Sequence, residues 1–533
     1  MFGHLLDAPR TTSLAALISL LLGLFFTFVW APHPWTWQGI DQYHELARAL
    51  ARGEGFNTTD VPWGYAYYLA FFYALFGERL WVPILVQVVA NATMPLMLFA
   101  IVQPLAGQRT ATLAALILGV FSFNTIYAST EMSDAISSVV FLAAVWCFFR
   151  AHATGRVGWF ALSGLLSGVA AQFRPNLLLL PAVVGAIYLL FIARKRLTHV
   201  VVFVCVSGLV VVPWIVRNYQ LAGVFLPTSS HGAIQLWYGS LQVGPYLENF
   251  SENPRAKLAE APIDYTSLVG MPIIVSIDAS ACSAEIRSAL ALSYWTGRDR
   301  TPRSVDLRAG EIQIPGQPDG TTVYWRIDPA PPDAAPSEYL VSTAHTQLEG
   351  KPAGSVAVPQ CLDRRVKLNH VFYRREIHNM RRYTALAIEN IRREPFAFAA
   401  ASVYRAVRVF VVRPASRGSA TYKFAGADLV YFAGLVLSLT YFLLFLAGVA
   451  VAWRQRSPLL AFLVPIVYVP ATICFVLTNQ RYSVTVQPLM FAFIALAIVT
   501  WWERKTGLRR GGFGLGLGAW GLEVLEGLAK LRS

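Results

Sequence analysis

The chain has 533 residues and a formal net charge of +14, and 55% of its residues are hydrophobic while only 14% are charged. With a mean hydropathy of +0.48, this composition excludes an ordinary soluble domain. The basic residues fall in short clusters between apolar runs, where membrane-orientation signals belong, so the positive charge does not indicate binding to nucleic acid.

The apolar runs predict an all-α polytopic membrane protein. Runs of the length needed to cross the hydrocarbon core, ~20 residues, recur at both ends of the sequence. The first run lacks an A-x-A cleavage pattern and leads into Trp30, Trp35 and Trp37, which are typical of a membrane interface, so we expect a retained helix rather than a cleaved signal peptide. The pattern predicts about ten transmembrane helices, over residues 12–31, 80–104, 110–128, 132–149, 158–172, 177–193, 198–216, 426–452, 457–477 and 484–502.

The short loops between these helices predict the orientation. If Arg10 lies in the cytoplasm, the loops after the even-numbered helices do so too, and every short basic loop then satisfies the positive-inside bias. The opposite face receives the first loop, residues 32–79, so we expect the chemistry there. The basic loops hold Arg109, Arg150 with Arg156, Arg194-Lys195-Arg196, Arg454 with Arg456, and Arg504-Lys505.

The predicted spans divide the chain into four regions. Residues 1–216 are expected to form an N-terminal membrane core, and residues 217–425 an extracytoplasmic insert with a juxtamembrane helix. Residues 426–502 would supply the C-terminal membrane helices, and residues 503–533 a cytoplasmic tail. The tail includes a possible amphipathic helix over 519–531.

The insert is expected to contain a small α/β subdomain. Pro, Gly and alternating stretches between Ser304 and Gln360 are typical of short strands and turns. Cys282 and Cys361 lie in this polar part and can form a disulfide if it is extracytoplasmic. Residues 370–412 read as a helix in which arginines alternate with apolar residues, and we expect it to lie along the membrane surface. The alternative is an extra span, which the arginines oppose.

The first loop carries the leading candidate for a catalytic base. Asp41 follows the first membrane helix and opens a short amphipathic helix, where a carboxylate can meet a lipid-linked substrate. A positioned base that accepts the proton of an attacking hydroxyl speeds a reaction by about 10²–10⁴-fold. An Asp at this place can also simply cap the helix that follows, and both interpretations stay open.

Four motifs follow one another along the chain. The acid-containing first loop continues as Tyr-His-x-Leu-Ala-x-x-Leu-x-x-Gly-x-Gly-Phe and then Pro-x-Gly-Tyr before a Phe-Gly pair. Further on stand Arg174-Pro175, the stretch Pro-Trp-x-x-Arg-Asn-Tyr around Arg217, and Arg481-Tyr482 before the last span. With these motifs the chain resembles the dolichyl-phosphate-mannose–protein mannosyltransferase-like group, glycosyltransferase family 39 in the broad sense, which includes the aminoarabinose transferases of lipid A. The likeness covers most of residues 30–245 and 470–500.

The resemblance implies the GT-C fold in the bacterial cytoplasmic (inner) membrane. It also implies an inverting transfer of a sugar from a polyprenyl-phosphate donor to an envelope acceptor on the extracytoplasmic face. Asp41 is then the leading base and Glu131 the second candidate, although the family commonly shows paired acids where this chain has Gln42 after Asp41. Glu131 and Asp134 open a predicted helix. Each can take part in the reaction or only stabilise the N-terminus of that helix, and both interpretations stay open. Membrane lipids and the sugar donor are the expected partners.

Cations are needed where the phosphate leaves, because fixed guanidinium groups can stabilise its growing negative charge. Arg174, Arg217 and Arg481 each lie at a predicted extracytoplasmic helix end, against the positive-inside bias, and are the predicted phosphate ligands. The alternative is that each side chain only reaches to the membrane interface. Since arginines can supply the charge and no DxD pair or His cluster stands out, we predict no metal and no cofactor. The predicted substrate contacts are Tyr43, His44, Tyr65 and Tyr482.

Three other functions are compatible with a polytopic chain. A transporter or flippase of lipid-linked solutes usually carries ionisable groups near the bilayer midplane and internal repeats, and neither is evident here. A pyrophosphate-dependent oligosaccharide ligase or oligosaccharyltransferase would differ in its metal dependence. A non-catalytic scaffold would tolerate replacement of Asp41 or Arg481. The segment from about 246 to 370 matches no known pattern, so the sugar and the acceptor stay unassigned.

Overall fold

The computed structural model places most of the chain. The tail helix expected over 519–531 lies outside the described residues. The described residues are 10–30, 41–53, 58–193, 196–256, 273–277, 279–296, 299–306, 311–318, 321–330, 336–341, 349–350, 359–362, 366–370, 372–412, 427–477 and 480–506.

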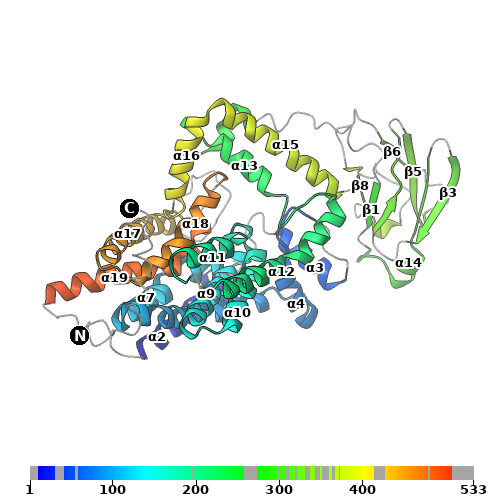
Figure 1. Cartoon of the computed structure of the whole chain (residues 1–533). Helices are drawn as coiled ribbons and strands as arrows, with labels where there is room; N and C mark the ends of the chain where they lie inside the picture. Colours follow the sequence, from blue (N-terminus) through cyan, green and yellow to red (C-terminus); the bar gives the residue numbers. More distant parts are fainter. Residues whose placement is uncertain are drawn as a thin grey trace.

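The N-terminal half of the chain is helical. Figure 1 shows its helices gathered in one bundle, with the strands of the insert grouped at one end of the molecule. The helices are α2 (Arg10–Phe25), continued by a π-helical turn η1 (Phe26–Trp30), α3 (Asp41–Ala51), α4 (Trp63–Phe76), α5 (Trp81–Ala92), α6 (Met94–Ala106), α7 (Gln108–Phe121), α8 (Phe123–Ala128), α9 (Ser133–Thr154), α10 (Val157–Phe173), the short η2 (Pro175–Leu177), α11 (Leu180–Phe191) and α12 (Leu197–Ala222).

The remaining helices follow α12 in the chain. In Figure 1, α15 runs back from the strands to α16, which leads toward α17 and α18. These elements are α13 (Gly232–Leu241), η4 (Gly244–Tyr246), η5 (Phe250–Glu252), α15 (Phe372–Arg393), α16 (Pro395–Arg408), α17 (Ala427–Arg454), η9 (Pro458–Phe462), α18 (Leu463–Ile473), η10 (Gln480–Ser483) and α19 (Gln487–Thr506).

Three helices that the sequence predicted as continuous are broken in the structure. Pro95 has no N–H for the helical bond to the carbonyl four residues earlier, and the run over 80–104 divides into α5 and α6 beside it. Ser122 is extended, and its hydroxyl accepts a hydrogen bond from the backbone N of Asn124 at 3.0 Å, which starts α8 anew. The helix expected over 370–412 is likewise interrupted just before Pro395.

Five helical stretches are long and apolar enough to cross a membrane, and they lie where the sequence predicted spans. The prediction of a polytopic helical fold with a small sheet-containing insert is confirmed, while the number of crossings stays a prediction. The five are Arg10–Trp30, Trp81–Ala106, Ser133–Thr154, Leu197–Gln220 and Phe432–Arg454. Shorter apolar helices are Gln108–Phe121, Val157–Phe173, Pro175–Phe191 and Pro458–Ile473.

The last helix, α19, is the centre of the bundle. Its residues from Gln487 to Leu496 are all buried, as expected for a helix that is apolar all round. On the side of α17 the rings of Tyr441 and Phe491 meet edge to face at 5.2 Å. This central position fixes the residues just before α19, which carry Arg481.

The two ends of the bundle differ in their polar contacts. At one end Arg109 pairs with Glu503 at 3.4 Å, and Arg196 donates a hydrogen bond to the carbonyl of His152 at 2.9 Å. These contacts join loops that the sequence predicted to share a face. The other end, which we call the site end, carries α3, α4, the turn after α10 and η10.

The insert contains two four-stranded sheets, and all described strand pairs are antiparallel. Along β5 the residues Val323, Trp325 and Ile327 are buried in alternation, so one face of the sheet covers the core of the insert. Cys282 and Cys361 form a disulfide with their Cα atoms 5.1 Å apart, as the sequence suggested. The elements are β1 (Ile273–Ile277), α14 (Ala284–Ala289), β2 (Ala291–Thr296), β3 (Asp299–Asp306), β4 (Glu311–Ile314), β5 (Thr321–Asp328), β6 (Ser337–Val341), β7 (Glu349–Gly350), η8 (Gln360–Leu362) and β8 (Val366–His370).

Candidate active site at the site end of the bundle

Arg174 caps the C-terminus of α10 and is buried, with 7% of its surface exposed. Its guanidinium forms an ion pair with Asp134 in the first turn of α9. Burial, and then the charge of Arg481, lower the pKa of Arg174 to about 10, so the side chain is still a cation at neutral pH. The buried pair therefore fixes a positive group at the junction of two helices.

Gly64 lets α4 approach this junction. A Cβ atom at position 64 would lie only 2.7 Å from the backbone oxygen of Gln172, two residues before Arg174. Any side chain there would push α4 away from the end of α10. Because Gly64 has no side chain, α4 can pack directly against the end of α10, which carries Arg174.

Tyr482 joins the two predicted phosphate-binding arginines. The guanidinium carbon of Arg174 lies 5.0 Å from the centroid of the Tyr482 ring, and that of Arg481 lies 5.6 Å from it. Both distances are within the range of cation–π attraction. Arg174 and Arg481 are more than 300 positions apart in the sequence, and the structure brings them to one ring, while their role as phosphate ligands stays a prediction.

Tyr43 of α3 faces the same cluster. Burial raises the pKa of the Tyr43 hydroxyl, and the charges of Arg174 and Arg481 oppose the rise. The Tyr43 ring also meets the ring of Tyr65 edge to face at 5.3 Å. The helix that starts at Asp41 is therefore anchored beside the arginines through a residue two positions later. The side chain of Asp41 itself lies outside the described part of the structure.

Glu131 lies in the loop between α8 and α9 and is 1% exposed. The loop is held by the buried side chain of Gln87 in α5, whose amide nitrogen donates to the carbonyls of Ala128 and Thr130 at 2.9 Å each. Glu131 also contributes to raising the pKa of Tyr65, after burial itself, so the two side chains are neighbours. This acid is thus enclosed by protein rather than open to solvent.

The start of α8, the helix before this loop, is tied to the segment that follows Arg481. The amide of Asn124 donates to the carbonyl of Val484 at 3.1 Å. The side-chain oxygen of Gln487 accepts hydrogen bonds from the Ser122 hydroxyl and from the backbone N of Phe123, both at 3.2 Å. Since buried amides are costly to leave unpaired, these contacts specify one arrangement of the two segments.

Arg217, the third predicted phosphate ligand, is engaged elsewhere. Its guanidinium donates to the carbonyl of Thr58 and to the side-chain oxygen of Asn218, both at 2.9 Å, and lies 4.5 Å from the ring of Trp214. These contacts attach the end of the first loop to the end of α12. The described contacts thus place Arg217 at the edge of the site, apart from the ring that joins Arg174 and Arg481.

Two predicted substrate contacts are packed within the first loop. The ring nitrogen Nδ1 of His44 lies 2.8 Å from the hydroxyl of Tyr73 in α4. Tyr65 is fully buried, and its hydroxyl donates to the side chain of Gln87 at 3.4 Å. Both residues hold α3 and α4 in place, whereas Tyr43 and Tyr482 lie next to the arginines.

Sequence reasoning missed a second acid at this end. Asp60 lies 3.1 Å from Nδ1 of His231, immediately before α13. It also contributes to the electrostatic environment of Tyr43. No spacing pattern could have indicated this pair, because 171 positions separate the two residues. Gln87 was missed for the same reason, since a single polar residue in an apolar run carries no motif.

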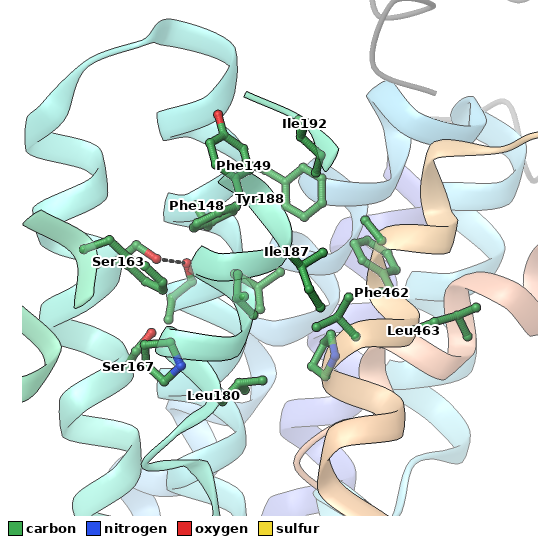
Figure 2. A pocket seen from close by; sticks show the side chains of 18 of the residues that line it. Phe148, Phe149, Ser163, Ser167, Leu180, Ile187, Tyr188, Ile192, Phe462 and Leu463 are labelled. Carbon is green, nitrogen blue, oxygen red and sulfur yellow. Dashed lines mark hydrogen bonds between the residues drawn. The ribbon is translucent and has the colours of Figure 1, made fainter. Parts of the chain in front are cut away.

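An apolar cavity of about 340 Å³ lies within the bundle. Figure 2 shows its side chains, with Ser163 donating to the carbonyl of Ala144 at 2.8 Å rather than into the cavity. Leu180 lines the cavity six residues after Arg174, and Phe141 lines it seven residues after Asp134. Seven residues of helix measure about 10 Å, so the cavity begins roughly that far from the ion pair.

No group of three or more His, Cys, Asp or Glu side chains in the described residues is arranged to hold a metal ion. The charged groups gathered at the site end are instead guanidinium and carboxylate groups in pairs. The arrangement can therefore bind an anion beside a tyrosine ring and present carboxylates nearby.

Comparison with known proteins gives the context for this arrangement. The family model described as dolichyl-phosphate-mannose-protein mannosyltransferase matches residues 60–216. YkcB of Bacillus subtilis, to which mannosyltransferase activity is assigned provisionally, is 26% identical over 214 residues. That alignment covers 39% of this chain and 28% of YkcB, so this chain matches less than a third of that relative's length.

Two solved structures align with most of this chain at low identity. A crystal structure of the oligosaccharyltransferase of Archaeoglobus fulgidus, tethered to an acceptor peptide, aligns with a TM-score of 0.46 and 11% identity over 98% of this chain and 54% of that chain. ArnT of Cupriavidus metallidurans, bound to undecaprenyl phosphate, aligns with a TM-score of 0.37 and 15% identity over 92% of this chain and 78% of that chain. Residues 60–216 carry the dolichyl-phosphate-mannose-protein mannosyltransferase signature, and the resemblance to family 39-like glycosyltransferases that the motifs predicted is confirmed.

Proposed function

We propose that this protein transfers a sugar from a polyprenyl-phosphate donor to an acceptor hydroxyl on the extracytoplasmic face of the cytoplasmic membrane. The observation that carries the proposal is the meeting of Arg174 and Arg481 on the ring of Tyr482, at 5.0 and 5.6 Å. Two guanidinium groups from different elements beside one tyrosine ring form a site suited to an anion such as a phosphate. The acceptor, whether lipid, glycan or protein, is left open.

The two arginines would have different roles in binding the donor phosphate. Arg174 is fixed by its ion pair with Asp134 and is almost fully buried, so it would hold one guanidinium group in a set position beside Tyr482. Arg481 is only partly buried and would make the direct contact with the donor phosphate. As the bond from the sugar to the phosphate breaks, negative charge grows on the phosphate oxygens, and preorganised cations stabilise that change. Arg217 would act by holding the first loop, with phosphate contact as its alternative role.

The base would come from the first loop. Asp41 opens α3 and precedes by two residues Tyr43, which lies beside the arginines, so we propose Asp41 as the base. In an inverting transfer it would accept the proton of the acceptor hydroxyl, whose oxygen attacks the sugar opposite the leaving phosphate. Glu131 remains the second candidate, although its enclosure by protein favours a supporting role.

The apolar cavity offers a place for part of the donor's prenyl chain. It starts roughly two helical turns from Arg174 and Asp134 and is lined mainly by aromatic and aliphatic side chains, among them residues of α9, α11 and α18, with two serines from α10. Apolar surface buried there contributes about 25 cal/mol per Å² to binding. The charge of the two arginines also makes a metal ion dispensable, and we propose a metal-independent reaction.

The test is a transfer assay with purified protein in lipid. Radiolabelled polyprenyl-phosphate sugars and cell-envelope acceptors would be incubated with the wild type, with Arg481→Ala and with Arg255→Ala, each with and without a chelator. Arg255 pairs with Glu394 and serves as a matched control outside the site. The proposal expects the wild type and the control to transfer sugar both with and without the chelator. The transfer rate of Arg481→Ala should be lower by about 10²-fold or more.

Other results would redirect the assignment. Transfer that the chelator abolishes would indicate a metal-dependent, pyrophosphate-type reaction. Transfer that Arg481→Ala leaves intact would remove the phosphate role of the arginine pair. No transfer from any donor would refute the glycosyltransferase and favour a transporter.

A further inference from the structure

We infer that Asp60, held in place by His231, forms the subsite that binds a second hydroxyl group of the acceptor, next to the hydroxyl that attacks the sugar. The inference rests on the proposed function and adds the part of the site that meets the second substrate. It also predicts that the acceptor presents an uncharged hydroxyl, rather than an anionic group such as a phosphate, because like charges repel at short range.

The pair itself is well defined. Both carboxylate oxygens of Asp60 lie within reach of His231 Nδ1, at 3.1 and 3.3 Å. The other ring nitrogen, Nε2, lies 2.7 Å from the amide nitrogen of Gln235, one helical turn further along α13. Because the amide nitrogen can only donate, Nε2 accepts, and the ring proton is on Nδ1, facing the carboxylate. His231 thereby orients Asp60 through a hydrogen bond from Nδ1 to the carboxylate.

The backbone around Asp60 is equally fixed. The N–H of Ser230 donates to the carbonyl of Thr59 at 2.7 Å, and the N–H of Asp60 itself donates to the hydroxyl of Thr58 at 3.0 Å. Arg217 donates to the carbonyl of Thr58 at 2.9 Å. A carboxylate held in this way loses little freedom when it binds a ligand, which favours affinity.

Asp60 also differs from the other described acids of the site in its exposure. Its side chain is 35% exposed and that of His231 is 42% exposed, whereas the side chain of Asp134 is 2% exposed and paired with Arg174. An ionised carboxylate accepts hydrogen bonds at several positions, and His231 occupies only one side. The open side of Asp60 can therefore accept a hydrogen bond from a hydroxyl that arrives from solvent.

Its location links the subsite to the donor. Gly64, four residues after Asp60, packs against the backbone of Gln172, two residues before Arg174, since a Cβ atom at position 64 would lie only 2.7 Å from the Gln172 oxygen. The charge of Asp60 also acts on Tyr43, as the charges of Arg174 and Arg481 do. A hydroxyl held by Asp60 would thus stand close to the cations that bind the donor phosphate.

The experiment measures the transfer rate against the amount of envelope acceptor fraction, with saturating radiolabelled donor. The variants are Asp60→Asn, His231→Ala and His231→Asn, the last of which keeps a nitrogen donor near the position of Nδ1. Glu394→Gln is the control, since it breaks another partly exposed ion pair. Binding of undecaprenyl phosphate to each purified variant reports the donor side.

The inference expects Asp60→Asn to raise the half-saturating amount of acceptor about tenfold, the usual effect of losing a hydrogen bond to a charged group. His231→Ala should raise it less, His231→Asn should restore it, and the control and undecaprenyl-phosphate binding should stay unchanged. An unchanged half-saturating amount in Asp60→Asn overturns the inference alone. A lower maximal rate at an unchanged half-saturating amount also overturns it, in favour of Asp60 as the base. If the wild type transfers no sugar, the proposed function fails and the inference with it.

Discussion

The ion pair between Arg174 and Asp134 permits a sharp test of structural against functional roles. The side chains are 9% and 2% exposed, so removal of one partner leaves the other charge buried without compensation. Such a change typically costs about 3–5 kcal/mol of folding free energy. We therefore expect Asp134→Asn to lower the free energy of unfolding by that amount. Glu389→Gln, which breaks an exposed pair with Arg393, should cost at most about 1 kcal/mol.

The double variant Arg174→Met with Asp134→Leu separates the two roles. Replacing both members of a buried pair by apolar residues is often neutral for stability, so this variant should unfold close to the wild type. It should nevertheless transfer sugar at least 10²-fold more slowly, because the fixed cation at the phosphate is gone. Unfolding would be followed in mixed micelles and transfer with the radiolabelled donor.

Two results would refute this reasoning. If Asp134→Asn is no less stable than Glu389→Gln, the pair is not buried as described. If the double variant transfers sugar at the wild-type rate, Arg174 has no part in binding the phosphate, and Arg481 would be the cation that matters.

Three further predictions concern the scaffold. Gly64→Ala should lower the free energy of unfolding by about 1–3 kcal/mol and reduce the transfer rate, because its Cβ would meet the backbone of α10. The control Gly158→Ala, whose Cβ would lie in open space, should leave thermal unfolding unchanged or make the protein slightly more stable. Replacing Cys282 and Cys361 by Ala should lower the stability of the insert by about 2–4 kcal/mol, measured as faster limited proteolysis, and equal resistance would contradict a role for the disulfide. Gln87→Leu should lower the transfer rate more than donor binding, since it frees the Glu131 loop, and a rate equal to the wild type would exclude this support.

Local sequence patterns predicted the helices of the fold well, but they predicted the ends of those helices less well. Apolar runs located the membrane helices because the bilayer sets their length and composition. Pro95 and Ser122 broke two of these runs, since a missing donor and a competing hydroxyl act through the backbone and leave hydropathy unchanged. The sequence did not decide whether Cys282 and Cys361 form a disulfide, because pairing depends on the distance between their Cα atoms.

Sequence motifs predicted the charged residues of the site, and the tertiary structure showed which of them lie together. Arg174 and Arg481 meet at Tyr482, while Arg217 is engaged with Thr58 and Trp214. All three look alike in the sequence, because each stands at a helix end. What each one contacts depends on which helices pack together, and no local pattern encodes that.

The sequence by itself determined that this is a polytopic membrane protein whose core resembles family 39 glycosyltransferases, because hydropathy and short motifs are local properties of the chain. Only the tertiary structure decided that Asp134 neutralises Arg174, that Gln87 supports the loop of Glu131, and that Asp60 meets His231 across 171 positions. These contacts join residues from different helices, and they form only when apolar packing in the bundle has brought those helices together.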